Sequence, residues 1–398
     1  MLPSECATSV YIHFPWCQRK CPYCDFASYR PNESGIPHEH YADAVLRELD
    51  LRWSEVRERP LQSIFFGGGT PSMWSPEALG RVLREIVGRF EAELETLEVT
   101  VECNPASFDE QTAWRLRQQG VSRVSIGVQA LESERLRYLG RIHSAEDALN
   151  ALRCALEIFP QVSADLIFGT PSQTPEEFEC EIQKVLDLGV NHLSVYALTI
   201  EPDTQFEALR RKGRLQIATE DLYAALYLRA EQVLTDRGLS HYEVSNYAAS
   251  GEECVHNLHY WNGGEYLGLG AGAVGRLPIS CVSSEECSSA ESRICARRFR
   301  NHPLPKNYMA SWTGLPEESV EYLSAETLVR ERLMLGLRTA AGLDISKIQT
   351  QTGLEVTKGR SKAIRRRAEQ GDLLVDQRRW SVPLERWLYL DGIVLDLF

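Results

Sequence analysis

Short runs of apolar and β-branched residues alternate along the chain with longer segments whose apolar positions recur at helical spacing. This alternation is typical of a parallel sheet built from βα units. The predicted strands are Val10–Phe14, Ser63–Phe66, Val99–Val101, Arg123–Ile126, Ser163–Phe168 and Ser194–Tyr196. The predicted helices between them are Tyr41–Trp53, Pro76–Phe90, Phe108–Gln119, Ala145–Ile158 and Pro175–Leu188. Strand and helix units in this order predict an α/β fold with an incomplete (βα)6 barrel.

The boundaries of these segments carry suitable residues. Ser75–Glu77 and Thr174–Glu176 each place a capping residue, a first-turn proline and an acidic residue in order. Gly120 and Gly189 follow two of the helical segments, where helices commonly end. Because the loops after the carboxyl ends of barrel strands usually carry the chemistry, we expect the functional residues just after the strands.

The pattern is lost between residues 276 and 305, which we interpret as an exposed loop or insertion. From Leu277 to Asn301 the chain is rich in Ser, Cys and Arg and lacks periodicity. Cys281, Cys287 and Cys295 have no metal-ligand spacing. Helical patterns then return at Ala325–Leu337 and Ser361–Gln370, followed by a strand-like Leu373–Val375. We therefore predict a barrel domain over 1–275 and a small α+β, winged-helix-like domain over 306–398.

The charge and the hydropathy of the chain restrict the possible partners. The 398 residues include 43 Lys+Arg and 56 Asp+Glu, a net charge of −13. This balance argues against binding of nucleic acid or anionic membranes by the whole surface. No uncharged stretch reaches about 18 residues, and Met1–Cys6 does not resemble a secretory signal. We expect a cytoplasmic protein, at most peripheral to membranes, whose 11 cysteines are reduced.

Cys17, Cys21 and Cys24 lie within eight residues, directly after the first predicted strand. Three thiolates in one loop can hold a soft metal centre, either zinc or an iron–sulfur cluster. Zinc would need a fourth ligand, whereas a cluster held by three cysteines leaves one iron open. The residues between the cysteines are polar, which argues against three cysteines that merely pack as small hydrophobes.

Other candidate residues end or follow the next strands. The glycine run Gly67–Gly69 allows close approach of the backbone to a ligand. Glu102 offers a carboxylate for hydroxyl or ammonium groups, and Gln129 follows the fourth strand. Asp165 interrupts an apolar strand, where an unpaired charge is costly, so we interpret it as functional.

The spacing Cys-x3-Cys-x2-Cys resembles the signature of radical S-adenosylmethionine enzymes. Longer motifs between positions 10 and 275 resemble the oxygen-independent coproporphyrinogen III oxidase group, and Arg330–Arg338 resembles its C-terminal domain. These motifs are Tyr11–Cys17, Gly67–Pro71, Arg123–Gln129, Gly140–His143, Asp165–Pro171 and Tyr196–Pro202. The resemblance implies a TIM-like radical SAM barrel, with S-adenosylmethionine and a [4Fe-4S] cluster held by the three cysteines.

The resemblance also implies which residues bind S-adenosylmethionine. Tyr11, Gly68 and Glu102 would line a first site. The positions that line a second site in the oxidase are matched by Tyr23, Gly69, Thr70, Gln129, Arg141, Asp165 and Ala197.

Within this group, two features resemble the HemW-type heme chaperones more than the oxidase. Phe26 stands where the oxidase has a fourth cysteine, and His256–Trp261 matches the motif H-N-x-x-Y-W. The resemblance makes His256 a candidate axial ligand of heme. From the residues alone, His256 and His259 share a face if the segment is helical, so either could bind heme iron; the alternative is a structural histidine beside core aromatics. Val274 departs from the family pattern, which often has a histidine at this position.

The implied function is to bind heme and to deliver it to an apo-protein, typically a respiratory enzyme, with possible dimerisation of the chaperone. Radical chemistry on a substrate is not required, so the resemblance leaves open whether the chain is an enzyme. Coproporphyrinogen oxidation remains the alternative, and an RNA-modifying radical enzyme is a third hypothesis. The third rests on a basic cluster: Lys358, Arg360, Lys362, Arg365, Arg366, Arg367, Arg378 and Arg379. The plain interpretation of that cluster is a solvated helical face. The alternative is a docking surface for an acidic partner, heme propionates or a membrane edge, and we expect no nucleic-acid partner.

Overall fold

The computed structural model describes residues 7–279, 290–311 and 314–398. In this part of the chain the main sheet has twelve strands, in the order β12-β11-β10-β9-β1-β2-β3-β4-β5-β6-β8-β7. Its central strands are β1 (Thr8–Phe14), β2 (Leu61–Gly68), β3 (Glu98–Cys103), β4 (Arg123–Gln129), β5 (Gln161–Phe168) and β6 (His192–Ala197). They pair in parallel and in chain order, which confirms the predicted incomplete (βα)6 barrel.

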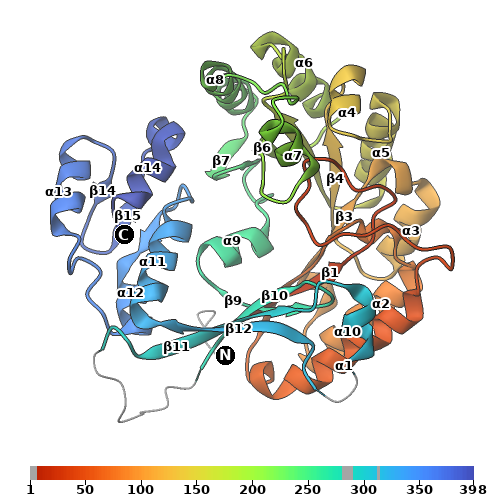
Figure 1. Ribbon diagram of the computed structural model, residues 1–398, viewed down its shortest axis with the longest axis horizontal. Helices are drawn as coiled ribbons and strands as arrows, with labels where there is room; N and C mark the ends of the chain where they lie inside the picture. Colours follow the sequence, from red (N-terminus) through yellow and green to blue (C-terminus); the bar gives the residue numbers. More distant parts are fainter. Residues whose placement is uncertain (1–6, 280–289, 312–313) are drawn as a thin grey trace.

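Helices between these strands cover the outer face of the barrel (Figure 1). They are α1 (His38–Val56), α2 (Pro76–Arg89), α3 (Glu110–Gln118), α4 (Ser133–Tyr138), α5 (Ala145–Ile158) and α6 (Pro175–Leu186). The predicted caps are present, since the side chains of Ser75 and Thr174 accept the amides of Ala78 and Glu177. Gly120 has a φ of +103°, a left-handed conformation that favours glycine at a helix end.

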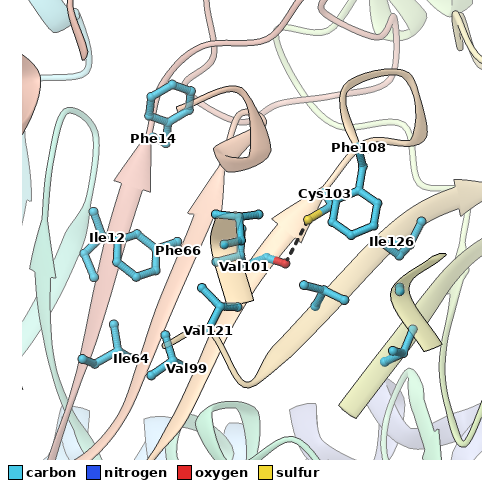
Figure 2. Close-up of a cluster of buried hydrophobic side chains, with 14 of the residues drawn as sticks. Ile12, Phe14, Ile64, Phe66, Val99, Val101, Cys103, Phe108, Val121 and Ile126 are labelled. Atoms are coloured by element: carbon cyan, nitrogen blue, oxygen red, sulfur yellow. Dashed lines mark hydrogen bonds between the residues drawn. The ribbon is translucent and has the colours of Figure 1, made fainter. Parts of the chain in front are cut away.

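The apolar core lies between the sheet and the helices, outside the barrel. Alternate residues of β1, β2 and β3, such as Ile12, Phe66 and Val101, are fully buried against the helices (Figure 2). The intervening residues point the other way, because side chains alternate along a strand. Many of these inward side chains are polar. The hydroxyls of Ser9 and Ser63 are hydrogen-bonded at 2.8 Å. The barrel therefore has a polar interior.

Beyond β1, the sheet continues through strands that were not predicted. These are β9 (Glu265–Leu269), β10 (Val274–Pro278), β11 (Ile294–Asn301) and β12 (Glu317–Ser324). The interpretation of 276–305 as a loop is therefore wrong for the end of β10 and for β11, where Cys295 is buried. The pattern was misleading because arginines of β11 are paired with carboxylates: Arg297 Nη1 is 2.9 Å from Glu317. Cys281 and Cys287 lie outside the described residues.

At the other edge, the chain passes through α7 (Gln205–Arg211), α8 (Glu220–Asp236), β7 (Ser240–Glu243) and β8 (Asn246–Ala248). It then forms the short helix α9 (Val255–Trp261), which packs against β2 and leads into β9. Figure 1 shows α9 between the barrel and the C-terminal domain. Helix α10 (Pro305–Ala310) contacts α1.

The C-terminal domain has its own apolar core, which includes Leu333, Ile364 and Trp380. Its elements are α11 (Ala325–Gly336), β13 (Leu343–Asp344), α12 (Ile345–Thr352), α13 (Ser361–Glu369), β14 (Leu374–Val375), β15 (Arg379–Ser381) and α14 (Leu390–Leu395). The small sheet has the order β13-β15-β14. Helix, strand, two helices and a β-hairpin in this order agree with the predicted winged-helix-like fold. In the described part of the chain, no helix has both the length and the apolar character to cross a membrane.

Much of the basic cluster is neutralised within the C-terminal domain. Arg360 pairs with Glu326 at 2.5 Å, and Arg366 pairs with Asp396 at 2.6 Å. Arg367 is 2.9 Å from Asp372. In these pairs, nearby carboxylates compensate the charges of the arginines. This favours a solvated surface over an open docking site for an anionic partner.

Candidate cofactor site

A cavity of about 500 Å³ opens at the carboxyl ends of the parallel strands. Twelve of the fourteen residues predicted for the cofactor and metal sites line it. These are Cys17, Cys21, Tyr23, Cys24, Gly68, Gly69, Thr70, Glu102, Gln129, Arg141, Asp165 and Ala197. The other two, Tyr11 and His256, lie elsewhere in the barrel. The structure thus brings together residues from six strands and the loops that follow them.

The cysteine loop is fixed to the end of β1 by backbone hydrogen bonds. The amide of Cys17 donates to Tyr29 O at 3.0 Å, and the amide of Tyr29 donates to Pro15 O at 2.8 Å. A tight turn follows, in which the amide of Cys24 donates to Cys21 O at 3.2 Å. The loop is therefore closed on itself and presents its three thiols to the cavity.

Two of the thiols accept hydrogen bonds from polar side chains of the cavity. The Thr70 hydroxyl donates to Cys17 Sγ at 3.4 Å, and Arg141 Nη1 donates to Cys21 Sγ at 3.7 Å. Burial raises the pKa of Cys17, and it raises the pKa of Cys24 to about 11. A bound metal overcomes this effect, because the thiolate is the form that ligates.

In the described part of the chain, no three His, Cys, Asp or Glu side chains are close enough to share one metal ion. Cys17, Cys21 and Cys24 instead lie around one cavity wall, with donors from Thr70 and Arg141 beside them. This arrangement fits a cluster of several irons, whose sulfur ligands accept hydrogen bonds of this kind.

The glycine run brings β2 against the cysteine loop. The amide of Gly69 donates to Phe14 O at 2.7 Å, and the amide of Thr70 donates to Trp16 O at 2.8 Å. A Cβ on Gly69 would lie 2.5 Å from Trp16 O, so only glycine permits this approach. The amide of Gly68 is also engaged, since it donates to Glu102 Oε2 at 3.0 Å.

Two carboxylates, Glu102 and Asp165, face the same cavity. Burial, with the nearby charge of Asp165, raises the pKa of Glu102 to about 7. Burial also raises the pKa of Asp165, although the Ser125 hydroxyl donates to its Oδ1 at 2.9 Å. Neither carboxylate forms an ion pair with a described Lys, Arg or His side chain. The pair therefore fits a ligand with ammonium and hydroxyl groups, as S-adenosylmethionine has.

The end of β4 is strained where it meets the cavity. Gln129 has a φ of +68°, and the amide of Ala130 donates to Val128 O at 2.9 Å, which together form a γ-turn. A turn of this sign is rare outside glycine, and such strain commonly marks functional sites. It points Gln129 into the cavity, next to Arg141, whose Nη2 donates to Gly127 O at 2.8 Å.

Several lining residues were missed, among them Ser125, Gly127, Tyr196 and Leu198. For the first three, the inward direction follows from the alternation along β4 and β6, a signal that the sequence contains, whereas Leu198 follows the end of β6. Tyr11, by contrast, is not on the cavity wall. Its hydroxyl is 3.0 Å from His13 Nδ1, and its ring stacks on Phe65 at 6.2 Å, inside the barrel.

His256 lies on α9, at the amino ends of the strands and away from the cavity. Its Nδ1 is hydrogen-bonded to the Ser63 hydroxyl at 2.9 Å, and its ring packs on Phe65 at 4.9 Å. Burial lowers the pKa of His256 to about 3, so the imidazole is neutral. His259 is held separately, with Nε2 2.8 Å from Glu265 O. The structure therefore separates the predicted heme ligand from the predicted cluster site.

Comparisons with known proteins agree with this arrangement. The radical SAM superfamily model matches residues 11–185, and the HemN C-terminal domain model matches residues 323–389. The heme chaperone HemW of Haemophilus influenzae is 38% identical over 100% of this chain and 99% of its own length. A mouse protein, the mitochondrial radical S-adenosyl methionine domain-containing protein 1, is 36% identical over 98% of this chain and 87% of its own.

Among solved structures, the coproporphyrinogen III oxidase HemN of Escherichia coli superimposes with a TM-score of 0.79. It covers 99% of this chain and 90% of its own, at 22% identity, a likeness of fold. The predicted resemblance is confirmed by the full-length relatives. The chain belongs to the HemW family within the radical SAM superfamily, a family that implies an iron–sulfur cluster and S-adenosylmethionine.

Proposed function

We propose that this protein binds heme through α9 and delivers it to an apo-protein. The observation that carries the proposal is the state of His256. Its Nδ1 is engaged by Ser63, which leaves Nε2 as the nitrogen that can bind a metal. Metal-binding histidines usually have their other ring nitrogen hydrogen-bonded in this way. Next to it on α9, Tyr260 is 39% exposed and offers an aromatic surface to a porphyrin.

The proposal gives the cavity a separate role. Cys17, Cys21 and Cys24 would hold a [4Fe-4S] cluster, while Glu102 and Asp165 would accept hydrogen bonds from S-adenosylmethionine. When bound, such a cluster supplies one electron at a time and an open iron for the methionine group. Arg141 would donate a hydrogen bond to the ligating sulfur of Cys21, and the γ-turn at Gln129 would orient its amide towards S-adenosylmethionine in the cavity.

Partners and location follow from the same proposal. The acceptor would be a respiratory enzyme, and the protein would dimerise and work in the cytoplasm, where its thiols stay reduced. The internal pairing of Arg360, Arg366 and Arg367 removes the main support for RNA as a substrate.

Coproporphyrinogen oxidation is the second candidate, because Gln129, Arg141, Asp165 and Ala197 all line the cavity where the oxidase group has its second S-adenosylmethionine. Phe26 argues against it. This side chain is 54% exposed at the cavity, in the place of the fourth cysteine of the oxidase.

The test is a hemin titration beside a decarboxylation assay on the same anaerobic preparation. We expect a Soret band in the wild type, weakened at least tenfold in affinity by His256→Ala. His40→Ala, which changes an exposed histidine of α1, serves as the matched control. Turnover of coproporphyrinogen III, or a Soret band unaffected by His256→Ala, would contradict the proposal.

A further inference from the structure

Helix α9 has only seven residues, too few to be stable on its own in water. Its stability must come from tertiary contacts, which include its packing against β2 and partners for the backbone groups at its two ends, where none exist within the helix. At the amino end, the partner is Glu98 of β3, which is 7% exposed. Its carboxylate accepts the amides of Val255 and His256, both at 2.8 Å. A negative charge at this end also suits the helix dipole.

At the carboxyl end, two buried arginines take the corresponding position. Arg276 of β10 is 3% exposed, and its Nη2 donates to the carbonyls of Gly263 and Gly264, at 2.5 and 2.8 Å. Arg332 of α11 lies on the same turn, and its Nη1 donates to Asn262 O at 3.5 Å. The ends of α9 are thus held by a carboxylate on one side and two guanidinium groups on the other, as the helix dipole favours.

Arg332 belongs to the C-terminal domain, and its side chain packs closely against the turn after α9. A Cβ on Gly263 would collide with its guanidinium, so the glycine makes room for it. Gln351 of α12 accepts from its Nη2 at 3.0 Å, which fixes the side chain from the other side. No described carboxylate lies within ion-pair distance of Arg332. Burial and the neighbouring Arg276 lower the pKa of Arg332 to about 9.

Burial of a cation without a carboxylate partner is costly for the free energy of folding. Arg330, two residues earlier on the same helix, is 53% exposed and pairs with Glu326 at the surface. Stability therefore does not explain why this arginine is buried. Among the described residues, its hydrogen bonds reach one segment outside its own domain, the end of α9.

We propose that Arg332 is a positioning residue for heme binding, through which the C-terminal domain fixes α9 and the orientation of His256. Glu98 and Arg276 hold the same helix from the barrel. The inference rests on the proposed function, since it assumes that α9 carries the heme ligand. It adds a role for the C-terminal domain, whose α11 contacts α9.

The experiment compares full-length Arg332→Gln, Arg332→Lys and Arg330→Gln with the wild type. Hydrogen exchange is measured first, on the protein without heme. We expect amide exchange over residues 254–264 to become at least about tenfold faster in Arg332→Gln, because a hydrogen bond from a charged donor is lost. Arg332→Lys keeps the charge and should stay within about threefold of the wild type, and Arg330→Gln should be unchanged.

Hemin titration is the second measurement. Arg332→Gln should raise the dissociation constant about tenfold and shift the Soret maximum, while the iron–sulfur absorption stays the same. A merely structural role would lower the melting temperature and leave exchange in α9 and the Soret position unchanged, which would overturn the inference. If His256→Ala leaves hemin binding intact, the proposed function itself fails. If His256→Ala weakens binding and Arg332→Gln does not, only this inference fails.

Discussion

The guanidinium of Arg141 joins the cysteine loop to the fourth strand, since its Nη1 lies 3.7 Å from Cys21 Sγ and its Nη2 bonds to Gly127 O at 2.8 Å. A fixed positive charge beside a thiolate stabilises negative charge on the sulfur. Because reduction makes an iron–sulfur cluster more negative, this contact should favour the reduced state.

Replacement of Arg141 by glutamine should therefore make the reduction potential of the cluster more negative. We expect a change of tens of millivolts, given that 59 mV in a one-electron couple equals about 1.4 kcal/mol. An anaerobic redox titration followed by electron paramagnetic resonance measures it. Arg137→Gln is the control, because that side chain is 73% exposed. Equal potentials in both variants would show that Arg141 does not act on the cluster.

Each of the substitutions Cys17→Ala, Cys21→Ala and Cys24→Ala should abolish the iron–sulfur absorption after anaerobic reconstitution. One lost ligand leaves two, too few to retain a cubane cluster in a solvent-accessible cavity. The iron and sulfide contents of the protein should fall together with the absorption. Cys180→Ala removes an exposed cysteine of α6 and should change nothing. A full cluster in any of the three variants would exclude that cysteine as a ligand.

Glu102→Gln should stabilise the protein at high pH and not at low pH. The pKa of Glu102 is raised to about 7. Ionisation of this carboxyl therefore lowers the free energy of unfolding as the pH rises from the ordinary pKa of a glutamate towards 7. A shift of this size corresponds to about 3 kcal/mol. Without added S-adenosylmethionine, the variant should melt several degrees above the wild type at pH 8 and at the same temperature at pH 4. An equal difference at both pH values would mean that the carboxylate is not the cause.

Gly69→Ala should displace the cysteine loop. The added Cβ would meet the carbonyl oxygens of Trp16 and Phe14, at 2.5 and 2.7 Å, and backbone cannot move away as a flexible side chain can. We expect a large loss of cluster occupancy after reconstitution. Gly88→Ala, in α2, meets nothing within 4 Å and should be neutral or slightly stabilising. Normal occupancy in Gly69→Ala would show that the loop tolerates the shift.

The barrel and most of its cofactor cavity were predictable because their signals are local. Strand alternation, Ser75 and Thr174 as caps, and the cysteine spacing each depend on a few neighbouring residues. The strand β11 was not predictable in this way. Arg297 and Arg298 look like solvent-exposed residues in the sequence, yet they pair with Glu317 and Glu321, partners that only the tertiary structure supplies.

The position of His256 was also not predictable from local sequence patterns. Its motif identified the residue, but no local pattern indicated that α9 would lie at the amino ends of the strands, opposite the cysteines. Tyr11 was likewise expected on the cavity wall and lies behind Gly67 instead, because glycine leaves room for its ring. Such placements depend on how distant segments meet, which no window of the sequence records.

The apolar core of this barrel lies outside the sheet, between Phe66, Val101 and the surrounding helices. The inward side chains are therefore not part of the apolar core that stabilises the fold. Evolution can exchange a cysteine for Phe26, or rebuild the polar residues at either end, without disturbing the packing that makes the chain fold. One scaffold can thereby hold different chemistry in its interior while its architecture stays the same.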